Sequence, residues 1–167
     1  MTIIRTKQFI LRPLQLSDTK GYFEVMQDQE TKMNLNSVPA DIKEARLEIK
    51  KYILQAKEKG SENFTIEIRK KYAGNVLLQP QNWDAKTTDG RVHLWIHPYF
   101  RGKGIATKAL EATISHGFEK RYDRIFAQHK AINKGLLKIM EKLGFRKVKV
   151  HMIDGAKKIL WVKEKKR

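Results

Sequence analysis

The stretch LWIHPYFRGKGIATKAL, residues 94–110, places a glycine-rich loop between an apolar strand-like run and a helical run. The first N–H groups of a helix have no carbonyl partner within the helix, and the helix dipole adds positive potential at the same end. Such a helix start commonly binds phosphate. Gly102 and Gly104 allow positive φ and a close approach of the backbone to a ligand, and Lys103 adds charge. The loop therefore predicts a site for a pyrophosphate group.

Two better-known glycine motifs do not fit this loop. A P-loop requires Gly-x-x-x-x-Gly-Lys-Ser/Thr, and a dinucleotide-binding loop requires a third glycine where Thr107 stands. An ordinary strand-to-helix turn with two permissive glycines is the structural alternative, and the loop by itself does not exclude it. The elements around the loop have to decide between the two.

The residues before the loop are predicted to form a strand, two helices and three further strands. Apolar runs bounded by glycine, proline and polar turn residues indicate the strands, and apolar residues three or four positions apart indicate the helices. The strands are expected at residues 9–14 (ended or placed at an edge by Pro13), 64–69, 74–78 and 91–97, with a turn-rich segment at 80–90; the helices are expected from residues 17–18 and between Asp41 and Gly60.

After the loop, the pattern predicts a helix, a short strand, a second helix and a hairpin. The expected ranges are 104–120, 124–128, 133–143 and, across Asp154-Gly155, 148–150 with 159–162. No linker or repeat interrupts this order. The sequence therefore predicts one mixed α/β domain covering residues 1–167, with a single sheet and helices on its faces.

The loop and its neighbours resemble the GNAT superfamily of N-acetyltransferases. The family signature is Arg or Gln, two residues, Gly, one residue, and Gly or Ala, and it is met by Arg101, Gly104 and Ala106. Residues 94–110 resemble the family's fourth strand and third helix. Residues 133–145, NKGLLKIMEKLGF, resemble its next helix and the Gly-Phe that closes it. Three motifs in the right order are far more specific than any one of them.

The first part of the chain is similar to one branch of that family. Residues 9–18, FILRPLQLSD, resemble the opening of the RimJ/RimL branch, which contains ribosomal-protein amino-terminal acetyltransferases. The resemblance implies a GNAT fold. Its single mixed, mostly antiparallel sheet has about seven strands, is splayed between the fourth and fifth strands, and carries about four helices on its faces.

The resemblance also implies acetyl-CoA as the cosubstrate. Its pantetheine arm enters the splayed gap and pairs with the backbone of the fourth strand, while its pyrophosphate lies on the loop and the first turn of the helix. The implied binding residues are Leu94, Trp95, Ile96, Arg101, Gly102, Lys103, Gly104, Ile105, Ala106, Thr107, Asn133 and Lys138.

In such enzymes a neutral amine attacks the thioester directly, and a strand N–H, expected near Ile96, stabilises the developing oxyanion. Proton transfer needs a base and an acid. The strand before the loop offers Asp89, His93 and His97 as bases. His93 is the expected catalytic residue because an unperturbed histidine, with a pKa of about 6.5, suits deprotonation of an ammonium near neutral pH. A packed strand histidine is the structural alternative.

A general acid is harder to place. Many relatives have a tyrosine in the helix after the splay, but the matching position in this chain is Met140, which has no proton to donate. Tyr99 and Tyr122 are close in sequence, although packed aromatic side chains are the ordinary explanation for both. Either another group acts as the acid or acid catalysis is dispensable.

Other kinds of chemistry find little support. The chain has no cysteine, which excludes disulfides, thiolate nucleophiles and Cys-ligated zinc. No serine lies in a Gly-x-Ser-x-Gly elbow. His93 and His97 would lie ~13 Å apart on a strand, too far to share an ion, and no metal is expected.

The formal charge is +17, and residues 101–167 carry 19 basic against 6 acidic side chains. Such a surface attracts polyanions and repels a polyamine, so a protein or peptide amino terminus, such as that of a ribosomal protein, is the favoured acceptor over a small-molecule amine. The alternative is a basic RNA- or ribosome-binding module on the same fold, using the cationic C-terminal hairpin. Lysines that keep edge strands from aggregating are the ordinary explanation for those cations.

The expected location is the cytoplasm, because no signal peptide or membrane-spanning run is present and no membrane association is indicated. The sequence leaves a monomer and a homodimer equally open.

Overall fold

A computed structural model describes residues 2–167. The strands are β1 (Ile4–Arg5), β2 (Ile10–Pro13), β3 (Glu62–Ile68), β4 (Lys71–Pro80), β5 (Asp89–Ile96), β6 (Arg124–Lys130), β7 (Arg146–Ile153) and β8 (Ala156–Glu164). The α-helices are α1 (Thr19–Gln27), α2 (Gln29–Asn34), α3 (Ile42–Lys59), α4 (Ile105–Lys120) and α5 (Lys134–Lys142). Short 3-10 turns η1 (Leu16–Asp18), η2 (Gln81–Trp83) and η3 (Pro98–Phe100) precede α1, β5 and α4.

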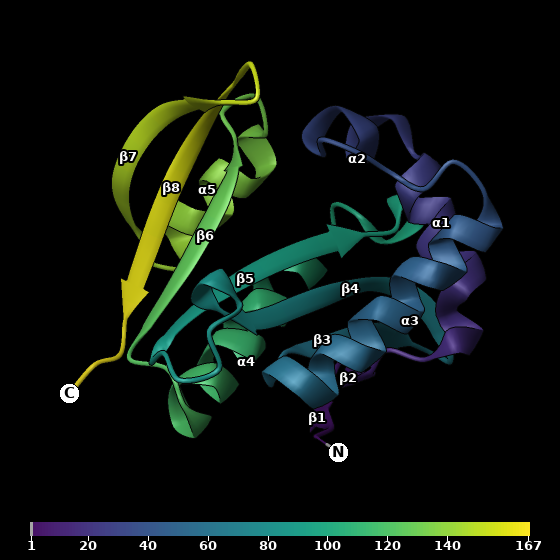
Figure 1. Cartoon of the computed structure of the whole chain (residues 1–167), viewed down its shortest axis with the longest axis horizontal. Coiled ribbons are helices and arrows are strands. Elements are labelled where there is room, and N and C mark those ends of the chain that lie inside the picture. The colour runs from purple at the N-terminus through teal and green to yellow at the C-terminus, as the bar shows by residue number, and fades with distance from the viewer. Residues whose placement is uncertain (1) are drawn as a thin grey trace.

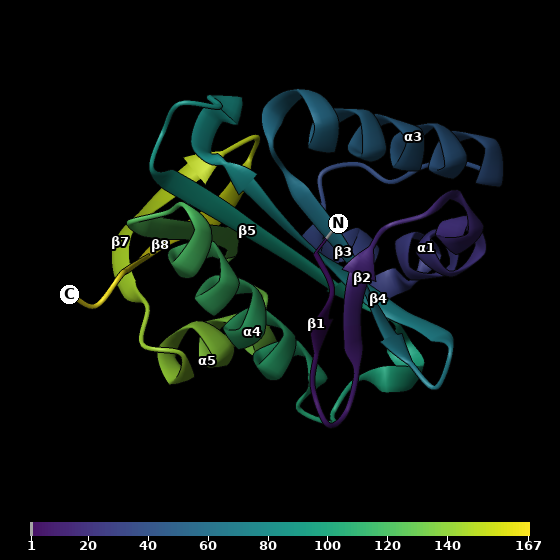
Figure 2. The same ribbon diagram turned by 90° about the horizontal axis from the view of Figure 1, so that it is seen from below.

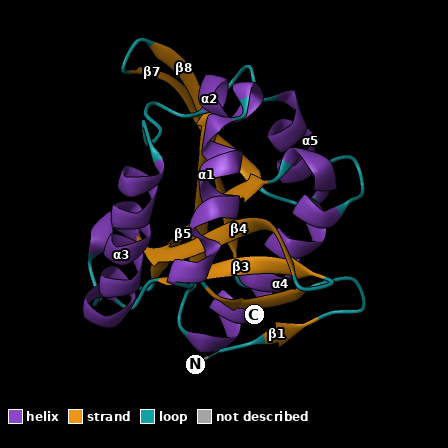
Figure 3. Ribbon diagram, turned by 90° about the vertical axis from the view of Figure 1, so that its right-hand side faces the viewer, coloured by secondary structure: helices purple, strands orange, loops and turns teal. Residues whose placement is uncertain are grey.

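The strands form one mixed sheet in the order β1-β2-β3-β4-β5-β6-β8-β7. All neighbours are antiparallel except β5 and β6, which are parallel. Helices α1 and α3 cover one face of the sheet and α4 and α5 cover the other (Figures 1 and 2). Figure 3 shows α1 and α3 side by side on their face. This arrangement confirms the predicted fold class.

Each face of the sheet has its own apolar core. The larger core joins the sheet to α4 and α5, with Ile105, Leu110 and Met140 among its buried side chains. The smaller one joins α1 to α3 and includes Tyr22 and Ile49. Because successive strand residues point to opposite faces, β5 contributes to both cores.

Strands β5 and β6 are paired over only three residues each. The parallel ladder joins Asp89, Gly90 and Arg91 to residues 124–126 and then stops. Beyond it, β5 continues against β4 while β6 continues against β8, so the two strands diverge (Figure 1). Because the divergent ends are held by different neighbours, the sheet keeps an opening in its middle.

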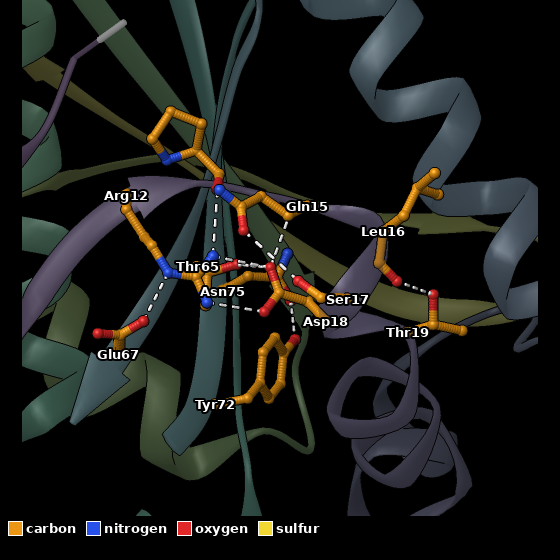
Figure 4. A network of polar contacts seen from close by, with 11 residues as sticks. Arg12, Gln15, Leu16, Ser17, Asp18, Thr19, Thr65, Glu67, Tyr72 and Asn75 are labelled. Carbon is orange, nitrogen blue, oxygen red and sulfur yellow. Dashed lines mark hydrogen bonds and ion pairs between the residues drawn. The ribbon is translucent and has the colours of Figure 1, made fainter. Parts of the chain in front are cut away.

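A polar network fixes the entry to α1 (Figure 4). Arg12 donates to both carboxylate oxygens of Asp18, from Nη1 to Oδ2 at 2.9 Å and from Nη2 to Oδ1 at 2.8 Å, and from Nε to Glu67 at 2.6 Å. The hydroxyl of Thr65 and the N–H of Gln15 also donate to Asp18. Burial alone would raise the pKa of Asp18, but these donors outweigh it and lower the pKa. The carboxylate therefore stays ionised where β2 leads into α1.

Residues 2–167 form eight strands and five α-helices, against about seven and four expected. The additional elements are β1, of two residues, and α2, of six. Both are too short for hydrophobic periodicity to register them. Pro13 is the last residue of β2, as expected, although β1 rather than β2 is the edge strand. Within residues 2–167, no helix is long and apolar enough to cross a membrane.

Candidate functional site

A cavity of about 410 Å³ lies where β5 and β6 diverge. We call it the splay cavity. Its walls come from β5, β6, α2, α5 and the loop that opens α4. Among the expected cofactor-binding residues, those that line it are Leu94, Trp95, Ile96, Arg101, Gly102, Gly104, Ile105, Ala106, Thr107 and Asn133. Lys103 and Lys138 are not among its lining residues.

The loop before α4 forms a cradle for an anion. Gly102 and Gly104 have φ values of 71° and 73°, which other residues adopt only with strain. A β-carbon added at either glycine would meet nothing within 4 Å, so the space beside the loop is open. Gly104 is the N-cap of α4 and offers no side-chain cap. The first N–H groups of α4 are therefore left for a ligand.

The edge of β5 that faces the splay cavity has no strand neighbour. Pairing with β6 ends at Arg91, and residues 92–96 are paired only with β4. Backbone N–H and C=O groups on this edge need partners, and an extended ligand can supply them as an added strand would. This edge is therefore available for the predicted pairing of a pantetheine arm with residues 94–96.

Gly74 of β4 sets the position of β5. Its φ is 148°, and a β-carbon there would lie 2.1 Å from the carbonyl oxygen of Trp95. Only glycine allows two backbones to approach so closely. Gly74 is the register partner of Ile96, and the N–H of His97 donates to the carbonyl of Ala73 at 2.8 Å. Among the strands, β4 alone pairs with the end of β5.

A match over most of the chain decides its family. Residues 8–146 match the family model described as the acetyltransferase (GNAT) domain. The chain belongs to the GNAT acetyltransferase family. No curated protein gives a significant match to the sequence.

Solved structures share the GNAT fold of this chain. RimL, a ribosomal L7/L12 alpha-N-protein acetyltransferase in complex with coenzyme A, has a TM-score of 0.83 at 16% identity, covering 98% of each chain. An acetyltransferase from Salmonella typhimurium that modifies the N-terminal serine of ribosomal protein L7/L12 has a TM-score of 0.83 at 15% identity, covering 99% of this chain and 100% of that one. MccE, the microcin C7 self immunity acetyltransferase in complex with acetyl-CoA and AMP, has a TM-score of 0.82 at 16% identity, covering 95% and 93%.

As a GNAT acetyltransferase, the protein is an acyl-CoA-dependent enzyme with acetyl-CoA as its cosubstrate. The splay cavity fits that molecule in three ways. The first turn of α4 is uncapped, the space beside Gly102 and Gly104 is open, and the edge of β5 is unpaired. The first two features suit a pyrophosphate, and the third suits the amide groups of pantetheine.

The signature arginine of this GNAT protein binds its own chain. Nη2 of Arg101 donates to Oδ2 of Asp28 at 2.7 Å and to the hydroxyl of Thr31 at 3.0 Å, and Nη1 donates to Glu30 at 3.0 Å. Its Nε donates to the carbonyl oxygen of Ile96 at 3.2 Å. Every guanidinium nitrogen of Arg101 has an acceptor within the chain, so its side chain joins the loop to α2.

The other expected contacts differ in how well they are placed. Asn133 lines the splay cavity and caps α5, its Oδ1 accepting from the N–H of Leu136 at 3.1 Å. Lys103 is exposed; its Nζ donates to the carbonyl of Tyr99 at 3.2 Å and lies 4.7 Å from the centre of that ring. Lys138 is exposed on α5.

Of the three expected bases, only His93 lines the splay cavity. Its ring stacks on Trp95, with centroids 6.1 Å apart. Burial, helped by the charge of Arg91, lowers the pKa of His93 to about 4. The unperturbed value that motivated its choice as the base therefore does not hold in the folded protein. Its imidazole is neutral at pH 7 and holds a proton weakly.

The remaining acid and base candidates lie outside the cavity lining. Asp89 forms a two-point ion pair with Arg124 at the closed end of the splay, and His97 lies 3.3 Å from Glu24. Tyr99 is 69% exposed, and Tyr122 is buried in the core. Met140 is 2% exposed and does line the cavity. The position that carries a tyrosine in many relatives is thus occupied here by an apolar side chain.

A second pocket, of about 360 Å³, adjoins the splay cavity on the side of α1 and α3. We call it the side pocket. It shares the residues Asn34, Leu35, His93, Trp95, Gln128 and His129 with the splay cavity. Its charged lining residues are Glu48, Arg91, Lys130 and Lys158. An amine that enters the side pocket would reach β5 at His93 and Trp95.

Helix α2 and His129 belong to the site although their sequence did not predict it. Helix α2 supplies Glu30, Thr31 and Asn34 to the splay cavity. His129 accepts from Nε1 of Trp161 at 3.0 Å, and its Nδ1 lies 2.8 Å from the carbonyl oxygen of Lys130. Burial lowers the pKa of His129, so the ring is neutral. The capping pair of Asp28 and Thr31 was the one local signal for α2.

Proposed function

We propose that the protein transfers the acetyl group of acetyl-CoA to a primary amine, with the amino terminus of a protein or peptide as the favoured acceptor. The observation that carries the proposal is the meeting of two pockets at one strand. The splay cavity offers the uncapped start of α4 and the unpaired edge of β5, and the side pocket reaches the same strand at His93 and Trp95. A cosubstrate and an acceptor can therefore approach β5 from opposite sides.

The thioester supplies an activated acetyl group: the amine nitrogen bonds to its carbonyl carbon, the C–S bond breaks, and the proton lost by nitrogen ends on the CoA sulfur. The residues of this chain orient the partners. An unpaired N–H of β5 near Ile96 would stabilise the charge that develops on the carbonyl oxygen. His93, being neutral, can accept a hydrogen bond from the amine and so direct its lone pair.

Proton transfer to the leaving thiolate has no dedicated side-chain acid in this proposal. Met140 lines the splay cavity where a tyrosine would serve, and the cavity lining contains no tyrosine. General acid catalysis contributes about 10²–10⁴-fold where it operates. We infer that the enzyme relies on positioning and on the β5 backbone, with solvent completing the proton transfer.

A protein amino terminus is favoured on two grounds. The RimL structures that share the fold belong to acetyltransferases of ribosomal L7/L12. The net charge of +17 also repels polyamines more strongly than acceptors of lower positive charge. The same positive charge would attract a ribosome, because ribosomal RNA is a polyanion.

Nucleic-acid binding through the last hairpin is the second candidate. Several of its cations have partners within the chain: Lys147 lies over the ring of Trp161, Lys163 donates to the carbonyl of Leu143, and Arg146 lies 3.7 Å from Glu164. These contacts give the cations structural roles. We therefore place this function behind acetyl transfer.

The test is thiol release from acetyl-CoA over a panel of ribosomal-protein amino-terminal peptides, polyamines, amino acids and aminoglycosides. We expect turnover with peptides and none with Gly104→Glu, whose side chain would enter the open space of the cradle. Efficient acetylation of spermidine with indifference to peptides would reject the favoured acceptor. Saturable CoA binding with no turnover of any amine would reject the enzymatic proposal, and salt-sensitive RNA binding without CoA binding would support the second candidate.

A further inference from the structure

The side pocket contains a cation that the protein does not pair. Arg91 lies on β5 and lines the side pocket, and its Nε is buried without a hydrogen-bond partner. Among the described residues its guanidinium has no ion pair within 4 Å. Burial lowers the pKa of Arg91, which reflects the cost of holding this charge away from water. Arg91 is half-buried, and a charge held partly away from water without a partner is costly, so it calls for a ligand that compensates it.

The other charges that line the side pocket leave it cationic. Lys158 is buried, and its Nζ is 4.0 Å from Asp154, the limit of an ion pair. Nζ of Lys130 donates to the carbonyls of Met33 and Leu35, which do not neutralise it. Glu48 is the one carboxylate in the lining, and its Oε2 already accepts from the hydroxyl of Tyr22 at 2.7 Å. Three cations therefore face a single carboxylate.

A second buried polar atom without a partner lies where the two pockets join. Oδ1 of Asn34 is buried and accepts no hydrogen bond, while its Nδ2 donates to the carbonyl of Glu30. Asn34 lines both the splay cavity and the side pocket. The site thus offers an unused acceptor on Asn34, where the two pockets join, and an unused donor on Arg91 in the side pocket. An amine with an anionic group a few bonds away would satisfy both.

We propose that the acceptor carries a carboxylate close to its amino group, and that Arg91, assisted by Lys158, binds this carboxylate in the side pocket. The inference rests on the proposed function and narrows its substrate class. For a peptide, the carboxylate belongs to an aspartate or glutamate within the first three residues. Asn34 accepts a hydrogen bond from the amino group, and Arg91 gives the selectivity because a guanidinium binds a carboxylate through two parallel hydrogen bonds.

The experiment compares peptides that differ only in one early residue, Ala-Glu against Ala-Gln and Ala-Lys, on the full-length protein. Wild type is expected to show a KM at least about tenfold lower for the glutamate peptide, since a charge-assisted pair contributes roughly 1.5–3 kcal/mol. Arg91→Gln should remove the difference, and Arg91→Glu should reverse it in favour of the lysine peptide. Arg46→Gln, which removes an exposed cation of α3 outside both pockets, should keep the preference.

A binding measurement separates this inference from the proposed function. Calorimetry with CoA present records the Kd of the N-acetylated forms of the same peptides, which need no turnover. Discrimination between glutamate and glutamine in binding, with no amine acetylated, would reject the function and keep the inference. Turnover of both peptides with equal KM, or a preference that survives in Arg91→Gln, would overturn the inference.

Two controls complete the design. The Kd of CoA itself should be unchanged in Arg91→Gln, which shows that the variant folds and that the splay cavity is intact. Free glutamate and alanine form a separate arm. A lower KM for free glutamate than for every peptide would keep Arg91 as the carboxylate receptor and identify an amino acid as the source of the carboxylate.

Discussion

Nη2 of Arg101 lies 2.7 Å from Oδ2 of Asp28, an oxygen that also accepts from the N–H of Thr31 and caps α2. One carboxylate therefore connects the start of α2 to the loop that opens α4. Burial alone would raise the pKa of Asp28, but Arg101 and the N–H of Thr31 lower it, so the pair stays ionised. The position of the cradle depends on a helix more than seventy residues earlier in the chain.

Asp28→Ala should loosen the cradle. The change removes the principal carboxylate partner of Arg101, and we expect the KM for acetyl-CoA to rise about tenfold, as for loss of a charge-assisted pair. Glu30→Gln is the matched control, because that carboxylate is 67% exposed and should matter less than about twofold. Steady-state kinetics with acetyl-CoA varied distinguishes them. Equal effects of the two changes would contradict the role given to Asp28.

Gly104→Ala should weaken cosubstrate binding beyond its cost in stability. The left-handed φ of 73° costs a non-glycine residue about 1–2 kcal/mol, and the added β-carbon enters the open space of the cradle. Gly155→Ala is the matched control: it has the same φ of 73° and the same open surroundings, in the β7–β8 turn. Both variants should lose similar stability in urea, and only Gly104→Ala should raise the Kd of CoA. A Kd raised equally in both would place the anion site elsewhere.

Gly74→Ala should displace β5. A β-carbon would lie 2.1 Å from the carbonyl oxygen of Trp95, so the strand that borders both pockets must shift. Overpacking of this kind typically costs about 1–3 kcal/mol. We expect a lower Tm than in the wild type. At temperatures equally far below the Tm of each variant, Gly74→Ala should also lose more activity than Gly155→Ala. Normal kinetics in a folded Gly74→Ala protein would show that the position of β5 is not critical.

Replacing Met140 should leave the rate of the chemical step nearly unchanged. Because Met140 has no proton to donate, Met140→Leu is expected to keep kcat within about threefold, as volume-conserving core changes usually do. Tyr99→Phe and Tyr122→Phe should also keep kcat, since neither hydroxyl belongs to a residue that lines the cavity. A kcat reduced by about 10²-fold or more in either tyrosine variant would identify a general acid.

Stability should fall as the pH drops from about 6.5 toward 4. In the unfolded chain His93 titrates near 6.5, whereas in the folded protein burial lowers its pKa to about 4. Within this window the unfolded state binds a proton that the folded state does not, so the free energy of unfolding decreases with falling pH. Urea unfolding should show a loss of roughly 1–2 kcal/mol between pH 7 and pH 5 from this group. His93→Gln should remove this part of the loss and leave the part due to His129, whose pKa burial also lowers.

The cradle could be predicted because the residues that form it are close together in the sequence. The glycines that require positive φ, the uncapped helix start and the preceding apolar strand lie within residues 94–110, so their pattern is visible in the sequence. The long helices and strands were recognisable for the same reason. Helix α2 and strand β1 were missed because they are shorter than the window over which periodicity can be measured.

The electrostatic environment was not predictable, because it depends on elements that meet only in the folded chain. The low pKa of His93 results from burial and from the charge of Arg91, and Glu48, the one carboxylate that lines the side pocket with Arg91, is hydrogen bonded to Tyr22. The side pocket itself combines residues from Tyr22 to Lys158. Its charge balance appears in no continuous stretch of sequence.

The unpaired edge of β5 has a consequence for the protein before it meets its cosubstrate. Exposed strand edges normally invite other chains to pair with them, and here such an edge is enclosed between α2, α4 and α5 instead of lying at the rim of the sheet. A bound pantetheine arm would act as the missing strand, so ligation would complete the sheet from within. Binding of acetyl-CoA would then stabilise the folded enzyme, and departure of the product would remove that stabilisation.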